Sequence, residues 1–396
     1  MQHTPDLSRD SLMPIVARPD TVFVRGQGDE LFDSTGRAYL DWVQGWAVNG
    51  LGHSPAVVVE ALCRQATQLI NPGPAYFNAP ALELSNLLTR HSGFDHVFFA
   101  SSGAEANEGA IKLARKWGQR HKNGAFEIIT FHDAFHGRTL ATMSATGKPG
   151  WDCKFAPQVP GFPKARLNDL DSVRALIGPN TVAVMLEPMQ GEAGVIVAEG
   201  RFLRALRELC TQQGLLLIVD EVQTGCGRTG PLFAHQAHDI APDIMTLGKG
   251  IGSGVALSAL LATRDASCFE PGDQGGTFCG NPLSCAAGVA TFHTLLADGF
   301  LAGMQAVSRH LIAGLHALAS EFGLGEVRGS GMLLALEMGA DTAPQVVACA
   351  RERGLLINAP RAHCLRFMPA LNTTPHSVDR GLALLRAALA DVAAGA

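Results

Sequence analysis

The chain has 396 residues, of which 47% are hydrophobic and 17% are charged, with 44 glycines and 21 prolines. This balance excludes an intrinsically disordered chain, which would carry more charge, and a coiled coil, which would be far richer in Glu and Lys. The formal net charge is −5, and the few lysines form no phosphate-binding stripe, so nucleic acid is not expected as a partner. A chain of this length predicts two or three domains, or one large and one small, and an enzyme is the leading interpretation.

The sequence gives no sign of export or membrane insertion. The first twenty residues include Asp6, Asp10 and Pro14 and lack the apolar core, roughly 7–15 residues long, of a secretory signal. No apolar stretch reaches the roughly 18 residues of a membrane-spanning helix. The nine cysteines are scattered without a C-x-x-C pair, which is typical of free thiols in a reducing compartment. We therefore expect a cytoplasmic protein with no membrane partner.

The predicted elements change character along the chain. Residues 20–42, with Gly-Asp and Thr-Gly turns, are typical of a small β-meander. The middle of the chain alternates helical patterns, such as residues 105–117, with short continuous apolar runs at 97–100, 128–131, 182–186, 215–219 and 244–247. Continuous runs favour strands buried on both faces, so we expect an α/β core with a parallel sheet between about residues 50 and 285. Helices at 300–320 and 376–393 flank a predicted strand at 332–336, in one further small domain or two that pack together.

Polar residues follow several of these runs, and ligands bind outside the carboxyl ends of strands in an open parallel sheet. Ser102 and Glu105 have the spacing of a capping box, and Gly103 lets the backbone approach a ligand closely. A strand, a Ser-Ser-Gly turn and the start of a helix together form an anion site. An ordinary capped helix without a ligand is the alternative interpretation.

The next strand end carries two histidines and an arginine. His132 and His136 have the spacing of a zinc-binding helix, but they follow a strand directly and Gly137 disfavours a continuing helix, so no metal site is expected. Arg138 suits a carboxylate or phosphate fork, with a surface arginine as the alternative.

Two further strand ends carry Asp220 and Lys249. Residues 225–230 match G-x-G-x-x-G, but the glycines start five residues after the predicted strand and no acidic residue follows about 20 positions later, which disfavours a dinucleotide site. Asp220 ends a buried apolar run, where a carboxylate is costly unless it faces a cation. Lys249 lies between a buried strand and a glycine run, unlike the other six lysines, and is poised to act as a Schiff-base nucleophile. A structural lysine is the alternative.

A phosphate site, a carboxylate, an arginine fork and a desolvated lysine at one sheet edge fit pyridoxal 5′-phosphate, which carries a phosphate, an aldehyde and a basic ring nitrogen. These residues also carry a resemblance. The segments SSGAEANEGAIKLAR (101–115), FHDAFHGRTLATMSATG (131–147), EPMQGEAGV (187–195), DEVQTGCGRTG (220–230), PDIMTLGKGIG (242–252), GGTFCGNPL (275–283) and LRFMPAL (365–371) resemble the class III aminotransferases, and within them the acetylornithine branch.

The resemblance implies pyridoxal phosphate fold type I. Its large domain has a mostly parallel central sheet between helices, at residues 49–288, and the smaller α+β domain is built from both chain ends, 1–48 and 289–396. It implies that Lys249 binds the cofactor covalently and moves the substrate proton, while Asp220 keeps the pyridine nitrogen protonated. The other implied cofactor-binding residues are Ser102, Gly103, Ala104, Phe135, Val222, Gln223 and Thr277, the last reaching the neighbouring subunit's phosphate in an obligatory homodimer.

The resemblance also implies the substrates. Arg138 would bind the donor's carboxylate, and Glu192 would release Arg366 to bind the α-carboxylate of 2-oxoglutarate. The implied reaction moves the δ-amino group of N2-acetyl-L-ornithine to 2-oxoglutarate, giving N-acetylglutamate 5-semialdehyde and glutamate. Gly276 stands where relatives often have Ser, and Cys279 replaces a common Gly, so succinylornithine, ornithine, succinyldiaminopimelate and 4-aminobutyrate stay open as donors. A cofactor-binding protein without catalysis is the alternative outside the enzymes.

Overall fold

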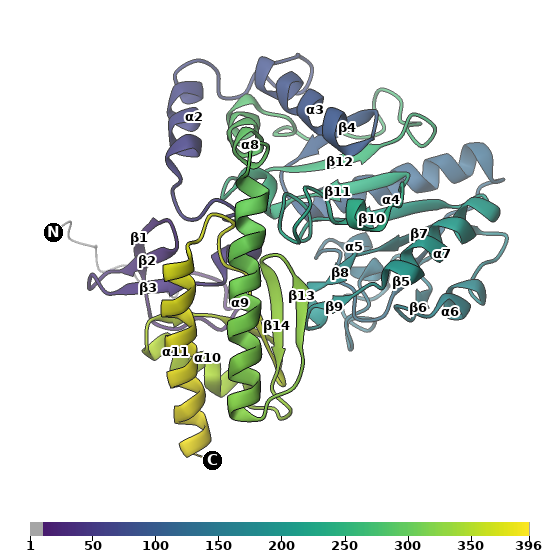
Figure 1. Cartoon of the computed structure of the whole chain (residues 1–396). Helices are drawn as coiled ribbons and strands as arrows, with labels where there is room; N and C mark the ends of the chain where they lie inside the picture. The colour runs from purple at the N-terminus through teal and green to yellow at the C-terminus, as the bar shows by residue number, and fades with distance from the viewer. Residues whose placement is uncertain (1–10, 396) are drawn as a thin grey trace.

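The computed structural model describes residues 11–395, and a seven-stranded sheet lies at its centre (Figure 1). The strand order is β4-β12-β11-β10-β7-β5-β6. The strands are β4 (His96–Ala100), β5 (Glu127–Phe131), β6 (Lys164–Ala165), β7 (Thr181–Leu186), β10 (Leu216–Asp220), β11 (Ile244–Leu247) and β12 (Ser258–Ala262). All five predicted strands are confirmed within one residue at each end. The prediction missed β12, which is antiparallel to both of its neighbours.

Helices cover both faces of this sheet because its side chains alternate between two apolar clusters. Ile128, Leu216 and Ile218 pack with the apolar face of α4 (Gly103–His121), whereas Ile129, Leu217 and Val219 pack in the larger cluster on the other face. That second face is covered by α7 (Gly200–Gln212), α3 (Ala79–Ser92) and α8 (Pro282–Leu295), as Figure 1 shows. Burial on both faces explains why these strands have continuous apolar sequences.

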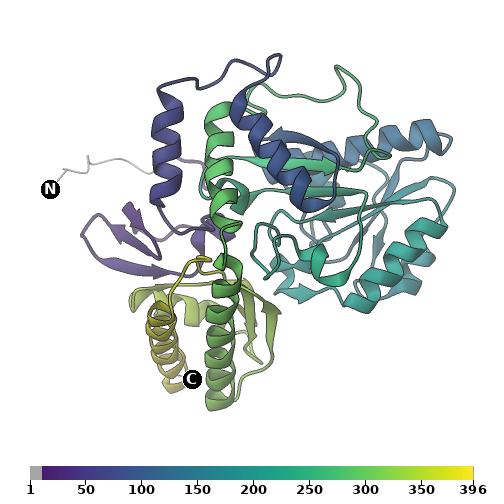
Figure 2. The ribbon, with the colours of Figure 1, turned by 45° about the horizontal axis from the view of Figure 1, so that its top comes forward.

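The two ends of the chain meet beside the large sheet. The N-terminal meander of β1 (Phe23–Gln27), β2 (Glu30–Asp33) and β3 (Ala38–Asp41) is confirmed, and β15 (Leu355–Leu356) pairs with β3 in parallel. A further antiparallel sheet has the order β13-β14-β17-β16, with strands Val327–Ser330, Leu333–Glu337, Cys364–Phe367 and Asn358–Arg361. Figure 2 shows the purple N-terminal strands beside the yellow-green C-terminal elements. The domain limits at residues 48 and 288 stay a prediction.

The remaining elements are short or lie at the periphery. The predicted C-terminal helices are α9 (Phe300–Phe322) and α11 (Pro375–Ala394), and both are confirmed. The others are α1 (Gln44–Ala47), α2 (Ala56–Ala66), α5 (Leu140–Ala145), α6 (Leu170–Arg174), α10 (Ala343–Glu352), the pair β8 (Met189–Gln190) and β9 (Ile196–Val197), and the 3₁₀ turns η1 (Gly191–Ala193), η2 (Ala234–His238) and η3 (Lys249–Gly252).

Two sequence-based expectations concern the chain as a whole. Within residues 11–395 no single helix is long and apolar enough to cross a membrane, although the bent pair α8 and α9, at 73°, passes that test when taken together. The nine cysteines are all free. Residues 1–10, which include Asp6 and Asp10 of the argument against a secretory signal, lie outside the described residues.

Candidate active site

The predicted site residues come from the carboxyl ends of parallel strands in the large sheet. β4 leads into Ser102 and Gly103, β5 into Phe135 and Arg138, and β11 into Lys249, while Asp220 is itself the last residue of β10. Asp220 was predicted to follow the strand, but its Cα is still in register with Thr246 of β11, so the strand extends one residue further.

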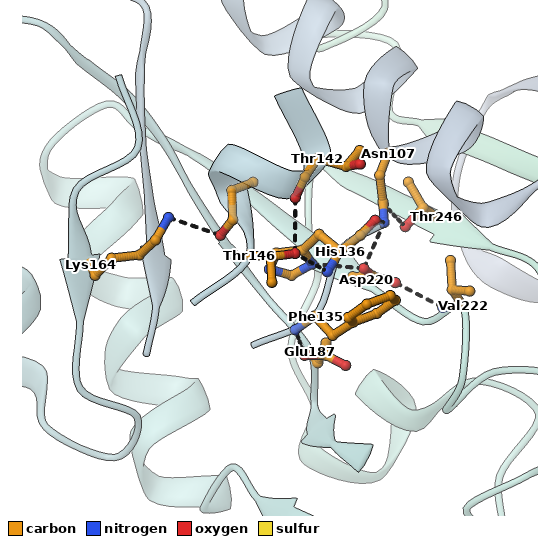
Figure 3. Close-up of polar contacts among 11 residues, drawn as sticks. Asn107, Phe135, His136, Thr142, Thr146, Lys164, Glu187, Asp220, Val222 and Thr246 are labelled. Carbon is orange, nitrogen blue, oxygen red and sulfur yellow. Dashed lines mark hydrogen bonds and ion pairs between the residues drawn. The ribbon is translucent and has the colours of Figure 1, made fainter. Parts of the chain in front are cut away.

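Asp220 accepts three hydrogen bonds in a buried position, as Figure 3 shows. Asn107 Nδ2 and His136 Nδ1 donate to its Oδ2 at 2.7 and 2.8 Å, and the backbone N–H of Val222 donates to Oδ1 at 3.0 Å. Three donors hold this carboxylate in one orientation. The site therefore places a carboxylate in a defined position at the end of the sheet.

The orientation of Asn107 is itself fixed. Thr246 Oγ1 donates to Asn107 Oδ1 at 2.6 Å, so the Asn107 amide nitrogen faces the carbonyl oxygen of His136 and Asp220 Oδ2, both at 2.7 Å. The sequence prediction missed Asn107 as a site residue. Its position four residues after Gly103, on the same face of α4, is the signal that could have found it.

His136 lies in the site as a hydrogen-bond donor to Asp220, not in the metal-binding arrangement considered from its sequence spacing. Its ring is buried and donates Nδ1–H to Asp220, and its Nε2 has no hydrogen-bond partner among the described residues. His132 is exposed, so the two histidines do not share a ligand. Within residues 11–395 no group of three or more His, Cys, Asp or Glu side chains is placed to hold a metal ion.

Lys249 begins the turn η3 in a left-handed backbone conformation, with φ +45°. A non-glycine residue with positive φ is strained, and such strain gathers at functional sites. Burial lowers the pKa of Lys249, and the carboxylates of Glu192 and Asp220 partly oppose this shift. The lowered pKa favours the neutral amine, which is the nucleophilic form of a lysine.

The N-terminus of α4 lies at the place where an anion site was predicted. Ser102 Oγ accepts from the N–H of Glu105 at 3.3 Å, and Glu105 Oε2 accepts from the N–H of Ser101 at 3.0 Å. In a capping box the second donor would be the N–H of Ser102, one residue later. A Cβ added at Gly103 would lie 2.6 Å from Val222 Cγ1. Glycine at 103 therefore lets the start of α4 pack against the loop that follows Asp220.

Phe135 is held beside Asp220 by a buried glutamate that the sequence prediction missed. Glu187 Oε2 accepts from the backbone N–H of Phe135 at 2.9 Å (Figure 3). Burial and the nearby charge of Asp220 raise the pKa of Glu187 well above its ordinary value. Glu187 follows β7 directly, so the rule of examining strand ends could have found it.

Arg366 and Glu192 form the predicted ion pair. Arg366 is fully buried on β17, and its Nη1 donates to Glu192 Oε1 at 2.7 Å and to Gln223 Oε1 at 3.4 Å. Asn358 Oδ1 accepts from Arg366 Nε at 3.3 Å, while Nη2 has no partner among the described residues. Burial alone would raise the pKa of Glu192, but the charge and hydrogen bond of Arg366 outweigh this effect. The pKa of Glu192 is therefore lowered. A buried guanidinium with an unsatisfied nitrogen is suited to receive a second carboxylate.

Arg138 is exposed and makes neither a hydrogen bond nor an ion pair with the part of the chain that the structure describes. Its Cζ lies 5.1 Å from the ring centroid of Trp151 and 6.0 Å from that of Phe135. The planar guanidinium is therefore positioned by aromatic rings and left open for an anion.

Thr277 and Gly276 lie away from the buried centre of the site. Thr277 is exposed, and its carbonyl oxygen accepts from Asn71 Nδ2 at 3.1 Å. A Cβ added at Gly276 would lie 2.6 Å from Cys279 Sγ, so the cysteine sulfur takes up the space of a side chain at 276. Residues 276 and 279 are thus close enough that a side chain at 276 would meet that of Cys279.

A second layer of polar contacts supports the loop that carries His136. Thr146 Oγ1 accepts from the backbone N–H of His136 at 2.9 Å and donates to the carbonyl oxygen of Thr142. Lys164 Nζ donates to the last carbonyl oxygens of α5, those of Ser144 and Ala145, at 2.7 and 3.0 Å. Burial lowers the pKa of Lys164 to about 7. These contacts fix α5 and hence the position of His136.

Comparisons with known proteins identify the family. The model of the class-III aminotransferases matches residues 15–389. The chain belongs to this family. It is 60% identical to "Acetylornithine aminotransferase 2" of Bordetella bronchiseptica, over 97% of this chain and 98% of that one, and 59% identical to "Acetylornithine aminotransferase" of Ralstonia nicotianae with the same coverage.

Solved structures of the family have the same fold. The ornithine aminotransferase of Toxoplasma gondii superposes with a TM-score of 0.93 at 31% identity, covering 98% of this chain and 94% of that one. The N-acetylornithine aminotransferase of Stenotrophomonas maltophilia superposes with a TM-score of 0.84 at 37% identity, covering 96% and 98%. The expectation of an α/β aminotransferase fold is confirmed.

Class III aminotransferases use pyridoxal 5′-phosphate, and the residues of this chain fit that group. Glycine at 103 lets the start of α4 approach the loop after Asp220, and the N–H groups at the N-terminus of a helix suit a phosphate. The buried carboxylate of Asp220 suits a pyridinium nitrogen, and the side chain of Lys249 makes no hydrogen bond with residues 11–395. The chain is a pyridoxal-phosphate-dependent transaminase.

Proposed function

We propose that the chain moves the δ-amino group of N2-acetyl-L-ornithine to 2-oxoglutarate, giving N-acetyl-L-glutamate 5-semialdehyde and L-glutamate. The single observation that carries this proposal is the identity of 59–60%, over 97% of the chain, with relatives named acetylornithine aminotransferase. The exposed, unpaired guanidinium of Arg138 supports it, because an acylated ornithine presents one carboxylate far from its reacting amine.

When bound, pyridoxal phosphate supplies an aldehyde that takes up the amino group and a ring that accepts electrons from the carbon losing its proton. Lys249 would hold the cofactor covalently and, when its amine is free, would carry the substrate proton on its Nζ. Asp220 would keep the ring nitrogen protonated, and Gln223 would donate its amide N–H to the ring hydroxyl. Phe135 and Val222 would enclose the ring, and Ser102, Gly103 and Ala104 would bind the phosphate. These roles combine the family resemblance with the geometry of the site.

The two substrates use the two arginines differently. Arg138 binds the α-carboxylate of the acylated donor, while Glu192 keeps the charge of Arg366 neutralised at 2.7 Å. For 2-oxoglutarate, Glu192 turns away and Arg366 binds the α-carboxylate, while Arg138 takes the distal one. One site then accepts a substrate with one carboxylate and a substrate with two.

A homodimer with shared sites completes the proposal. Large apolar side chains gather near Thr277: Phe77 is 90% exposed, Tyr76 71% and Phe278 66%, and Asn71 in the same loop bonds the Thr277 backbone. Exposed apolar side chains that gather in this way are typical of an interface. Thr277 would bind the partner's phosphate, so Thr277→Ala in one subunit should weaken cofactor binding in the other. The enzyme would act in the cytoplasm.

Ornithine is the second candidate donor, because the structural superposition is with an ornithine aminotransferase at a TM-score of 0.93. A donor panel separates the candidates. The purified holoenzyme is assayed for kcat/KM with N2-acetylornithine, succinylornithine, ornithine, succinyldiaminopimelate and 4-aminobutyrate, with 2-oxoglutarate in excess. We expect acetylornithine to exceed ornithine, whose α-ammonium would be buried without a partner. Higher kcat/KM for ornithine or 4-aminobutyrate would overturn the choice of donor and leave the transaminase intact.

A further inference from the structure

Lys148 and Trp151 stand at the two ends of one tight turn beside the site. The turn has the sequence Lys148-Pro149-Gly150-Trp151, and the N–H of Trp151 donates to the carbonyl oxygen of Lys148 at 3.1 Å. Gly150 has φ +74°, which with proline before it is typical of a type II turn. The preceding Gly147 donates its N–H to the carbonyl oxygen of Ala134 at 3.0 Å, so the turn is attached to the loop that carries Phe135 and Arg138.

The ring of Trp151 brings two cations together. The Arg138 Cζ lies 5.1 Å from its centroid and the Lys148 Nζ lies 5.4 Å from it, while Phe135 meets the same ring edge-on at 5.9 Å. The ring is nearly buried, so its position is fixed by packing. An aromatic face attracts each cation, but two like charges held on one ring repel each other unless an anion lies near both.

Neither cation has an anionic partner within residues 11–395. Four other lysines, Lys112, Lys116, Lys122 and Lys164, each donate a hydrogen bond to an oxygen, whereas Lys148 and Arg138 donate none. The charge of Lys148 is also among those that lower the pKa of Glu192 against the effect of burial, after those of Arg366 and Lys249. Within the described residues, no carboxylate neutralises the two cations on the Trp151 ring.

We propose that Lys148 is a second carboxylate-binding residue, which acts together with Arg138 on the substrate carboxylate that lies farthest from the reacting carbon. This inference rests on the proposed function, in which Arg138 binds that carboxylate in the donor and in 2-oxoglutarate. The guanidinium offers a planar fork, and the ammonium adds a point charge that adapts to substrates of different length. Trp151 holds the two groups at a fixed separation, so the ring acts as a positioning residue.

The test compares donors that differ only in the carboxylate. N2-Acetylornithine carries it, and N-acetylputrescine is the same molecule without it. In Lys148→Gln holoenzyme we expect KM for acetylornithine and for 2-oxoglutarate to rise roughly tenfold, with kcat within about twofold, because a charge-assisted contact is lost at a half-exposed position. The kinetics of N-acetylputrescine should not change. Lys148→Arg should keep most of the affinity.

Lys154→Gln is the matched control. Lys154 is exposed, its side chain has no hydrogen-bond partner among the described residues, and its backbone N–H bonds the Trp151 carbonyl oxygen. Lys154→Gln should leave KM unchanged for both acetylornithine and 2-oxoglutarate. An equal rise in KM for N-acetylputrescine in Lys148→Gln would mean that the lysine acts through the fold, and an effect on 2-oxoglutarate alone would mean that it acts on Glu192. Either result, or no change at all, overturns the inference.

A last measurement separates this inference from the choice of donor. Inhibition by glutarate is measured against whichever amino donor the unmodified enzyme uses best. Glutarate carries two carboxylates and no reacting group, so its inhibition constant should rise in Lys148→Gln even if acetylornithine proves to be the wrong donor. Unchanged inhibition by glutarate in a variant of an active transaminase overturns the role of Lys148 alone.

Discussion

Replacing Asp220 with Asn tests the centre of the proposed mechanism. The amide is isosteric but neutral, and its oxygen keeps the contacts with Asn107 and His136 if its nitrogen turns toward Val222, whose N–H now lies 3.0 Å from Asp220 Oδ1. One hydrogen bond is then lost and one buried N–H is left without an acceptor, which costs about 1–3 kcal/mol of folding free energy.

The rise in the activation free energy of turnover should be larger than this loss of folding free energy. Removing one charge from a buried pair costs about 3–5 kcal/mol. At about 1.36 kcal/mol for each factor of ten, this corresponds to a fall in turnover of roughly 150- to 5,000-fold. The phosphate contacts that we propose for Gly103 do not involve the Asp220 side chain, so the variant should still bind pyridoxal phosphate. Single-turnover absorbance with saturating acetylornithine measures the step, and the absorbance of the bound cofactor measures occupancy.

Glu221→Gln is the control, because Glu221 is the next residue and equally buried but bonds elsewhere. It accepts from the N–H of Ala234 at 2.6 Å and from the N–H and Nδ1 of His235 at 2.9 and 2.7 Å. Its amide variant should lose stability on a similar scale and retain turnover. The assignment of Asp220 is refuted if Asp220→Asn turns over within fivefold of the unmodified enzyme, or if Glu221→Gln slows it as much.

Three further predictions concern other parts of the site. Borohydride reduction of the holoenzyme, followed by peptide mapping, should place the cofactor's mass on Lys249, and label on another lysine would disprove its role. The pKa of Glu192 is lowered in the folded protein, so the stability from its pair with Arg366 should be present above about pH 4.5 and lost as the pH falls through the lowered pKa. In thermal denaturation, Glu192→Gln should not show this acid-dependent loss of stability. A pH profile identical to that of the unmodified enzyme would contradict the pairing. Gly276→Ser should force the Cys279 side chain to move, because its Cβ would lie 2.6 Å from Cys279 Sγ. A double-mutant cycle with Cys279→Gly should therefore show non-additive effects on the melting temperature, and additive effects would disprove the contact.

The strands and much of the cofactor site could be predicted from the sequence because local patterns determine them. Each parallel strand is buried on both faces, so its apolar run is continuous, and the residue after it lies at the ligand-binding edge. Asp220 and Lys249 were found in this way. β12 was missed because its short apolar sequence, Ser258–Ala262, follows a glycine-rich turn and periodicity alone does not separate it from a buried helix segment.

The partners of these residues could not be predicted, because they are distant along the chain. Asn107 is 113 residues from Asp220, and Glu187 is 52 residues from Phe135. Nothing in the local sequence specifies which buried donor meets which carboxylate, since strand order and loop packing decide it. His136 is an example. Its spacing from His132 raised the possibility of a metal site, whereas in the structure its ring donates a hydrogen bond to Asp220.

The comparisons also separate what the scaffold determines from what side chains determine. The backbone superposes better on the ornithine aminotransferase of Toxoplasma gondii, at a TM-score of 0.93, than on the N-acetylornithine aminotransferase of Stenotrophomonas maltophilia, at 0.84, although the second is more similar in sequence. Backbone similarity therefore does not follow the substrate for which each relative is named, which is expected where donor choice depends on side chains on a shared fold. We propose that Gly276 with Cys279, and Lys148 on the Trp151 ring, are such positions here. Substitutions there should change the ranking of donors without changing the fold, whereas substitutions at Asp220 or Lys249 should slow every donor alike.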